Sequence, residues 1–85
     1  SSGEINFRVK DARAAINIVL AAYRADALSF DDTDGVSLAF KDWRLNVRSS
    51  NTEPLVRLNV ESRGGAEELE QKVGAIAQLL GGTNA

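Results

Sequence analysis

Three short segments in the middle of the chain carry a large apolar residue at every second position, and this pattern constrains the fold most. The segments are residues 36–40, 43–47 and 56–60, and in each of them an apolar side chain occupies every second position. A period of two is typical of a β-strand that buries one of its faces. Because the three segments follow one another without an intervening helix, they favour an antiparallel sheet.

The segments on either side complete the predicted set of elements. Residues 5–9 alternate like a first strand, and residues 28–30 suggest a short second one. Apolar residues three and four positions apart predict one helix over residues 12–23 and another over residues 69–80. Asp11 is placed to cap the first helix.

The predicted order is β-α-β-β-β-β-α, which indicates an α+β fold. We expect a four-stranded, mainly antiparallel sheet with two helices packed on one face. A chain of 85 residues is long enough for one domain, so we expect a single domain over residues 1–85. The last three residues, 83–85, are expected to be a frayed tail.

The composition excludes several classes of site and partner. The chain contains neither cysteine nor histidine, so disulfides, thiolate metal sites and Ser-His-Asp or Cys-His catalytic sites cannot be assembled from it. The net charge is −2, whereas domains that bind nucleic acids normally carry a positive excess. No apolar run approaches the roughly 20 residues of a membrane span, and the first residues do not resemble a signal peptide. We therefore expect a soluble, cytoplasmic domain.

The polar face of the predicted sheet carries several arginines. Arg44, Asn46 and Arg48 alternate with apolar residues on one strand, and Arg57 lies on the polar face of the next strand. If the intervening loop closes a simple hairpin, Arg57 faces Asn46 and lies within diagonal reach of Arg44 or Arg48. Three arginines would then gather near one end of this face, and we expect an anion or a partner domain to bind there.

The connection between the last two strands, residues 48–54, has an unusual composition. Its sequence is RSSNTEP, which combines an arginine, three small hydrogen-bonding side chains, an acid and the only proline of the chain. A phosphate dianion is bound by convergent N–H and O–H donors and by a guanidinium that can donate two hydrogen bonds. The groups that can supply them are those of Arg48, Ser50, Asn51 and Thr52. From chemistry alone, a site for an anion and a hydrophilic hairpin turn both remain open.

Two other features are interpreted as structural. The turn DDTDG, residues 31–35, is rich in acids but fails the calcium-loop pattern, since Phe30 and Lys41 fall where that pattern requires ligands. We expect it to be a plain turn, separate from the loop, so that Asp34 has no influence on anion binding. Trp43 shares its strand face with apolar residues, so we expect core packing and not stacking on a sugar or base.

The segment DGVSLAFKDWRLNVRSSNTEPLVRLNVESRG, together with the start SGEINF, closely resembles a known family. It is similar to the C-terminal, fourth domain of the α-D-phosphohexomutase superfamily, and within it to bacterial phosphomannomutase/phosphoglucomutase. The resemblance covers nearly the whole chain. The resemblance implies a TATA-box-binding-protein-like fold that closes over a sugar phosphate. It also implies that the domain grips the phosphate that is not transferred while the 1-phosphate and 6-phosphate of the sugar interconvert reversibly.

The resemblance also implies where the chemistry lies. The residues that match the family's phosphate ligands are Arg48, Ser50, Asn51 and Thr52, with Arg57 as a weaker candidate. The phosphoserine and the Mg²⁺ site of the family lie in other domains, so this chain is expected to contain no catalytic or metal-binding residue. We expect it to be an inactive part of a larger isomerase, with a mannose or glucose phosphate and the other domains as its partners.

Two alternatives to this function remain. The chain could be a free-standing module that binds phosphorylated ligands or proteins through the same loop. It could also bind nucleic acid, which only the analogy of fold suggests and which the acidic charge disfavours.

Overall fold

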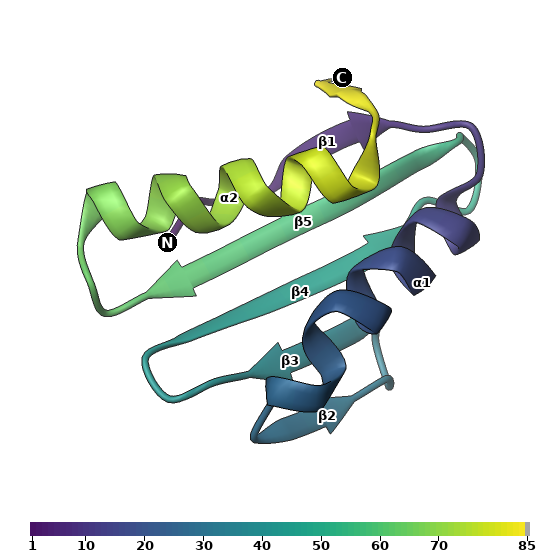
Figure 1. Ribbon diagram of the computed structural model, residues 1–85. Coiled ribbons are helices and arrows are strands. Elements are labelled where there is room, and N and C mark those ends of the chain that lie inside the picture. Colours follow the sequence, from purple (N-terminus) through teal and green to yellow (C-terminus); the bar gives the residue numbers. More distant parts are fainter. Residues whose placement is uncertain (85) are drawn as a thin grey trace.

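The computed structural model describes residues 1–84, whose strands form a single sheet (Figure 1). The elements in chain order are β1 (Ile5–Arg8), α1 (Ala12–Tyr23), the short 3-10 helix η1 (Arg24–Asp26), β2 (Ser29–Asp31), β3 (Val36–Ala39), β4 (Trp43–Ser49), β5 (Leu55–Ser62), α2 (Ala66–Leu80) and β6 (Thr83–Asn84). Across the sheet the strands are ordered β2-β3-β4-β5-β1-β6, and every neighbouring pair is antiparallel.

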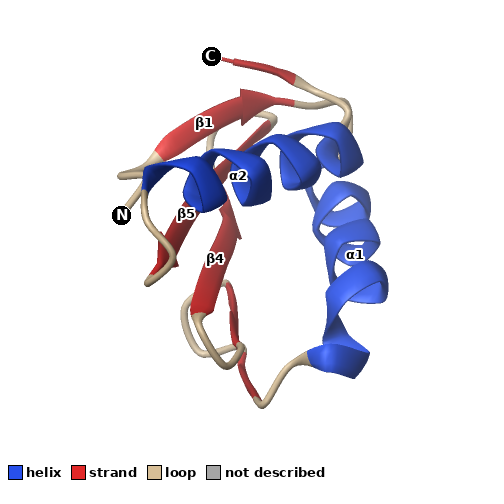
Figure 2. Ribbon diagram, turned by 60° about the vertical axis from the view of Figure 1, so that its left-hand side comes forward, coloured by secondary structure: helices blue, strands red, loops and turns tan. Residues whose placement is uncertain are grey.

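The α+β architecture is confirmed, but the expected number of strands is wrong. Both helices lie on the same side of the sheet, as Figure 2 shows. The sheet has six strands instead of four: β2, close to the short strand predicted at residues 28–30, lies at one edge, and the two-residue β6, which was not predicted, lies at the other. Every residue of β2 is exposed, so this edge strand buries neither of its faces. The tail is also not frayed throughout: Thr83 and Asn84 pair with β1, and Ala85 lies outside the described residues.

The helices begin and end where local chemistry favours it. The Asp11 side chain accepts a hydrogen bond from the Ala14 amide at 3.1 Å, which confirms the predicted cap of α1. Helix α2 ends at Gly81, whose left-handed conformation (φ 70°) lets its amide donate to the Ala77 carbonyl. Neither helix, nor any other within residues 1–84, is long and apolar enough to cross a membrane.

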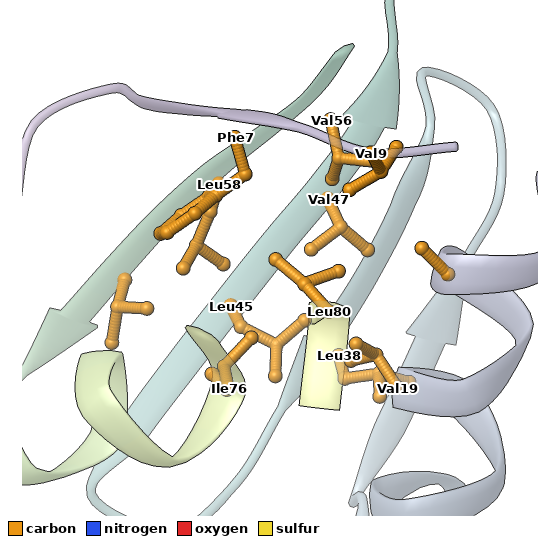
Figure 3. Close-up of a cluster of buried hydrophobic side chains, with 12 residues drawn as sticks. Phe7, Val9, Val19, Leu38, Leu45, Val47, Val56, Leu58, Ile76 and Leu80 are labelled. Atoms are coloured by element: carbon orange, nitrogen blue, oxygen red, sulfur yellow. The ribbon is translucent and has the colours of Figure 1, made fainter. Parts of the chain in front are cut away.

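The core lies between the sheet and the two helices (Figure 3). Side chains of the sheet point toward Val19 of α1 and Ile76 of α2, both fully buried. Trp43 packs at the edge of this cluster and stacks on Phe40, with ring centroids 4.2 Å apart, so the expectation of core packing is confirmed. The opposite face of the sheet carries no helix within the described chain (Figure 2), and the candidate site lies at one end of that face.

Candidate functional site

The candidate site is a hollow beside the loop that connects β4 and β5. Its volume is about 510 Å³, and the five residues predicted from the sequence all line it. The lining residues are Asp34, Gly35, Arg48, Ser49, Ser50, Asn51, Thr52 and Arg57. The β4–β5 loop and the β2–β3 turn lie at the same end of the sheet, as Figure 1 shows, which is why residues from both reach one hollow.

The loop is held in shape by hydrogen bonds within it and to its neighbours. The Ser50 amide donates to the Leu55 carbonyl at 3.1 Å, so pairing continues one step beyond the ladder and only residues 51–54 form the bend. The Thr52 amide donates to the Ser50 hydroxyl oxygen at 3.3 Å. The Val9 amide donates to the Pro54 carbonyl at 2.9 Å, which ties the loop to the chain after β1.

Hydroxyl groups gather on the inner side of this bend. The hydroxyl oxygens of Ser50 and Thr52 lie 3.5 Å apart, and Asn51 between them is exposed. Small polar side chains in a tight bend present several donors toward one point. Such an arrangement can bind the oxygens of an anion from one side, whatever the rest of the ligand is.

The two arginines of the hollow face each other across the hairpin. Arg48 pairs with Arg57 in the β4–β5 ladder, whereas Asn46 pairs with Asn59. The expected register, with Arg57 opposite Asn46, is therefore wrong by two residues. The length of the bend is the reason: Ser50 bonds to Leu55, whereas the expected register would have set it opposite Glu53, so the bend is two residues longer than expected.

The third arginine does not join them. Arg44 lies opposite Glu61 in the ladder, and the Arg44 Nε is 3.7 Å from a Glu61 carboxylate oxygen. The expected cluster of three arginines is thus a pair, Arg48 and Arg57. Like charges in directly opposed positions normally destabilise a sheet, so their pairing is more readily explained by binding than by folding.

Acidic residues balance the charge of Arg48. Its Nη2 atom lies 3.1 Å from a Glu4 carboxylate oxygen, and its Nη1 atom lies 3.7 Å from Asp34. The side chain of Arg48 is 39% exposed, so its guanidinium is held by these contacts and still reaches solvent. Because these contacts already restrict the Arg48 side chain, binding of an anion would cost little additional side-chain entropy.

Arg57 lies deeper in the polar face than Arg48. Its Nε atom is buried and has no hydrogen-bond partner within residues 1–84, and the same holds for the side-chain oxygens of Asn6 and Asn59. Asn6 pairs with Arg57 in the β1–β5 ladder, so these groups share one patch of the sheet. Buried polar atoms without partners are rare in folded proteins, and several in one patch indicate a surface shaped for something other than folding.

The sequence did not predict that Asp34 and Gly35 belong to the site. The turn of residues 31–35 was interpreted as separate from the loop, and that interpretation is wrong. A signal was available: only two residues separate the predicted strands of residues 36–40 and 43–47, and such a tight connection sets Val36 opposite Val47 and so brings Gly35 beside Arg48. No group of three or more acidic, cysteine or histidine side chains within the described chain is arranged to hold a metal ion.

Comparison with known proteins identifies the family. Residues 4–79 match the family described as Phosphoglucomutase/phosphomannomutase, C-terminal domain. The chain belongs to this family. The match extends over all strands from β1 to β5, α1, and α2 up to its penultimate residue, and it includes the loop and the turn that form the hollow.

Individual relatives agree with this assignment. The chain is 56% identical over 81 residues to a protein named Phosphohexose mutases from Xanthomonas campestris pv. campestris, which covers 95% of the chain. It is 54% and 49% identical over 80 residues, or 94% of the chain, to phosphomannomutases of Salmonella montevideo and Escherichia coli K12. The chain spans 18% of the length of each of these relatives.

Proposed function

We propose that the hollow beside the β4–β5 loop binds the phosphate group of a phosphorylated hexose. One observation carries the proposal: five residues chosen for their phosphate-binding chemistry line a single hollow, in a domain of the phosphoglucomutase/phosphomannomutase family. The ligands would be Arg48, Ser50, Asn51 and Thr52, with Arg57 supplying charge from the opposite strand.

The chemistry of these groups suits a phosphate that is held and not transferred. Hydroxyl, amide and guanidinium groups donate hydrogen bonds to phosphate oxygens but do not attack phosphorus at neutral pH without an activating base. The chain contains no histidine or cysteine, and the two acids nearest the site, Glu4 and Asp34, contact the Arg48 guanidinium. Such a site recognises the phosphate and leaves the sugar ring to other contacts.

In a full-length mutase this domain would position the substrate. We propose that it grips the non-transferred phosphate of mannose or glucose phosphate while the 1-phosphate and 6-phosphate interconvert elsewhere in the same cytoplasmic protein. Fixing one end of the sugar lowers the entropic cost of placing the other end at the reacting group. A phosphoserine and Mg²⁺ would be supplied by the other domains, and the sheet topology would be that of a TATA-box-binding-protein-like fold.

The test is a titration of the ¹⁵N-labelled chain with inorganic phosphate and with glucose 6-phosphate. We expect amide shifts centred on Ser49–Glu53 and Arg48, with a dissociation constant in the millimolar range, about −4 kcal/mol. Added salt should weaken binding, because the attraction acts between charges near the surface. Duplex DNA at low salt should produce no comparable shifts.

Variants make the titration specific. Arg48→Ala should abolish the shifts, and Arg48→Lys should restore them only in part, since lysine keeps the charge but not the planar pair of donors. Arg57→Ala should weaken the shifts less than Arg48→Ala. Shifts that avoid residues 48–53, or that survive in Arg48→Ala, would refute the proposed site. The isolated chain should show no mutase turnover with Mg²⁺ and a bisphosphorylated sugar.

A further inference from the structure

The two carboxylates that meet Arg48 approach it from different surroundings. Asp34, next to Nη1, lines the same 510 Å³ hollow as the β4–β5 loop. Glu4, next to Nη2, lines a separate cavity of about 70 Å³ that also touches Asn59. One end of the guanidinium is therefore turned to the hollow in which an anion would bind, and the other end is held outside it.

The turn that carries Asp34 is fixed against β4. Gly35 has φ +73°, and a Cβ atom built on it would lie 2.5 Å from the Arg48 Cβ and 2.6 Å from the Val47 carbonyl oxygen. Only glycine allows so close an approach. The Asn46 side chain donates hydrogen bonds to the Asp34 carbonyl at 3.2 Å and to the Ser37 hydroxyl at 2.8 Å. The backbone of the turn is thus held in place beside the guanidinium.

The side chain of Asp34 is held much less firmly than its backbone. It is 85% exposed and lies 3.7 Å from Nη1, whereas Glu4 is 46% exposed and lies 3.1 Å from Nη2. An exposed ion pair at the longer distance contributes little and exchanges easily with another anion. The shorter and less exposed contact with Glu4 is the one that orients Arg48.

We infer that Asp34 is a competing carboxylate that an incoming phosphate displaces from Nη1 of Arg48, while Glu4 keeps its contact with Nη2. The inference rests on the proposed function of the hollow. In the free domain Asp34 occupies the position at Nη1 that a phosphate oxygen would take, while Glu4 orients the guanidinium. In the bound state its negative charge remains nearby, so it limits the affinity and favours release of the phosphate. Asp34 is accordingly a positioning residue that tunes the site.

The displacement can be observed directly in the wild-type chain. We expect titration with inorganic phosphate to shift the ¹³C carboxyl resonance of Asp34, because the carboxylate exchanges its guanidinium partner for water. The carboxyl resonance of Glu4 should move much less, since its contact persists. A shift of Glu4 that exceeds that of Asp34 would overturn the inference.

A matched pair of variants separates local competition from overall charge. Asp34→Asn and Asp32→Asn change the net charge equally and lie in the same turn, but Asp32 does not line the hollow. We expect Asp34→Asn to bind inorganic phosphate about threefold more tightly than wild type, as the loss of an exposed competing ion pair would allow. Asp32→Asn should bind with nearly wild-type affinity.

The outcomes distinguish this inference from the proposed function. If wild type binds phosphate at the loop but the two variants gain affinity equally, or if Asp34→Asn binds no more tightly than wild type, the inference is wrong and the phosphate site stands. If phosphate shifts no resonance near residues 48–53 in any of the three proteins, the proposed site fails and the inference fails with it.

Discussion

The two faces of the sheet differ in what holds them together. On the face covered by the helices, the side chains of Leu45, Val47, Leu58 and Val60 are at most 2% exposed and pack against one another. On the open face, Arg57, Asn59 and Asn6 leave buried polar atoms without a hydrogen-bond partner in the described chain. The covered face therefore supplies the stability, and the open face retains groups that folding alone would not select.

Adjacent positions of the same ladder show the difference most clearly. Val47 pairs with Leu58 on the covered face, and the next pair along the hairpin joins Arg48 to Arg57 on the open face. A one-residue step thus leads from an apolar pair in the core to two like charges. Substitutions on the two faces should have correspondingly different effects, which the following predictions test from the largest to the smallest.

The largest effect should come from the covered face. Leu58→Ala removes a fully buried side chain from the centre of the core, and we expect it to lower the free energy of unfolding by about 3 kcal/mol. Urea denaturation followed by circular dichroism measures this, provided that the wild-type chain unfolds in one cooperative transition, as we expect. A loss below about 1 kcal/mol would show that the covered face is not the main source of stability.

The next effect concerns the turn that reaches over the open face. Gly35→Ala combines a positive φ with a clash against Arg48 and Val47, and we expect a loss of about 2 kcal/mol together with weaker phosphate binding. Gly81→Ala is the control: it has φ +70° but no atom within 4 Å of the added Cβ, so it should cost only about 1 kcal/mol. Equal losses in the two variants would mean that the close approach to β4 has no energetic role.

Two asparagines that face each other on the open face should respond in opposite directions. Asn46→Val removes two hydrogen bonds and should destabilise the chain by about 1–2 kcal/mol. Asn59→Val removes a buried oxygen that has no partner within residues 1–84, and it should stabilise the chain by about 0.5 kcal/mol. Thermal and urea unfolding measure both. If Asn59→Val is as destabilising as Asn46→Val, the open face is optimised for folding after all.

The smallest effect lies in the acidic turn. Hydrogen bonds from the Thr33 hydroxyl and, as a smaller cause, from the Thr33 amide at 2.8 Å stabilise the Asp31 carboxylate. They hold the pKa of Asp31 below its ordinary value. Because the pKa is lower in the folded than in the unfolded state, the ionised carboxylate stabilises the fold at pH values above the unfolded pKa. That contribution is lost as the pH falls through the folded pKa. Thr33→Val should raise the pKa of Asp31 only part of the way, because the amide remains. A ¹³C carboxyl titration between pH 2 and 6 measures this, and an unchanged pKa would exclude the hydroxyl as its main cause.

Much of the covered face and of the loop could be predicted from local patterns. Alternation identified the strands from β1 to β5, and periodicity identified both helices, including the cap of α1 at Asp11. The five candidate phosphate ligands were chosen by side-chain chemistry and by resemblance, and all five line one hollow. Edge strand β2 begins and ends one residue later than the predicted strand of residues 28–30, and Leu28, which is 75% exposed, lies outside it.

The sequence by itself determined the apolar faces of the helices and of the central strands and the polar composition of the β4–β5 loop, because side-chain polarity and spacing are local properties that any strand or bend of this composition displays. Only the tertiary structure decided which segments meet. The pairing of Arg48 with Arg57, the addition of the edge strands, and the approach of Asp34 and Glu4 to one guanidinium all depend on ladder register. Register follows from how each connection closes, and it joins residues as far apart in the chain as Phe7 and Asn84.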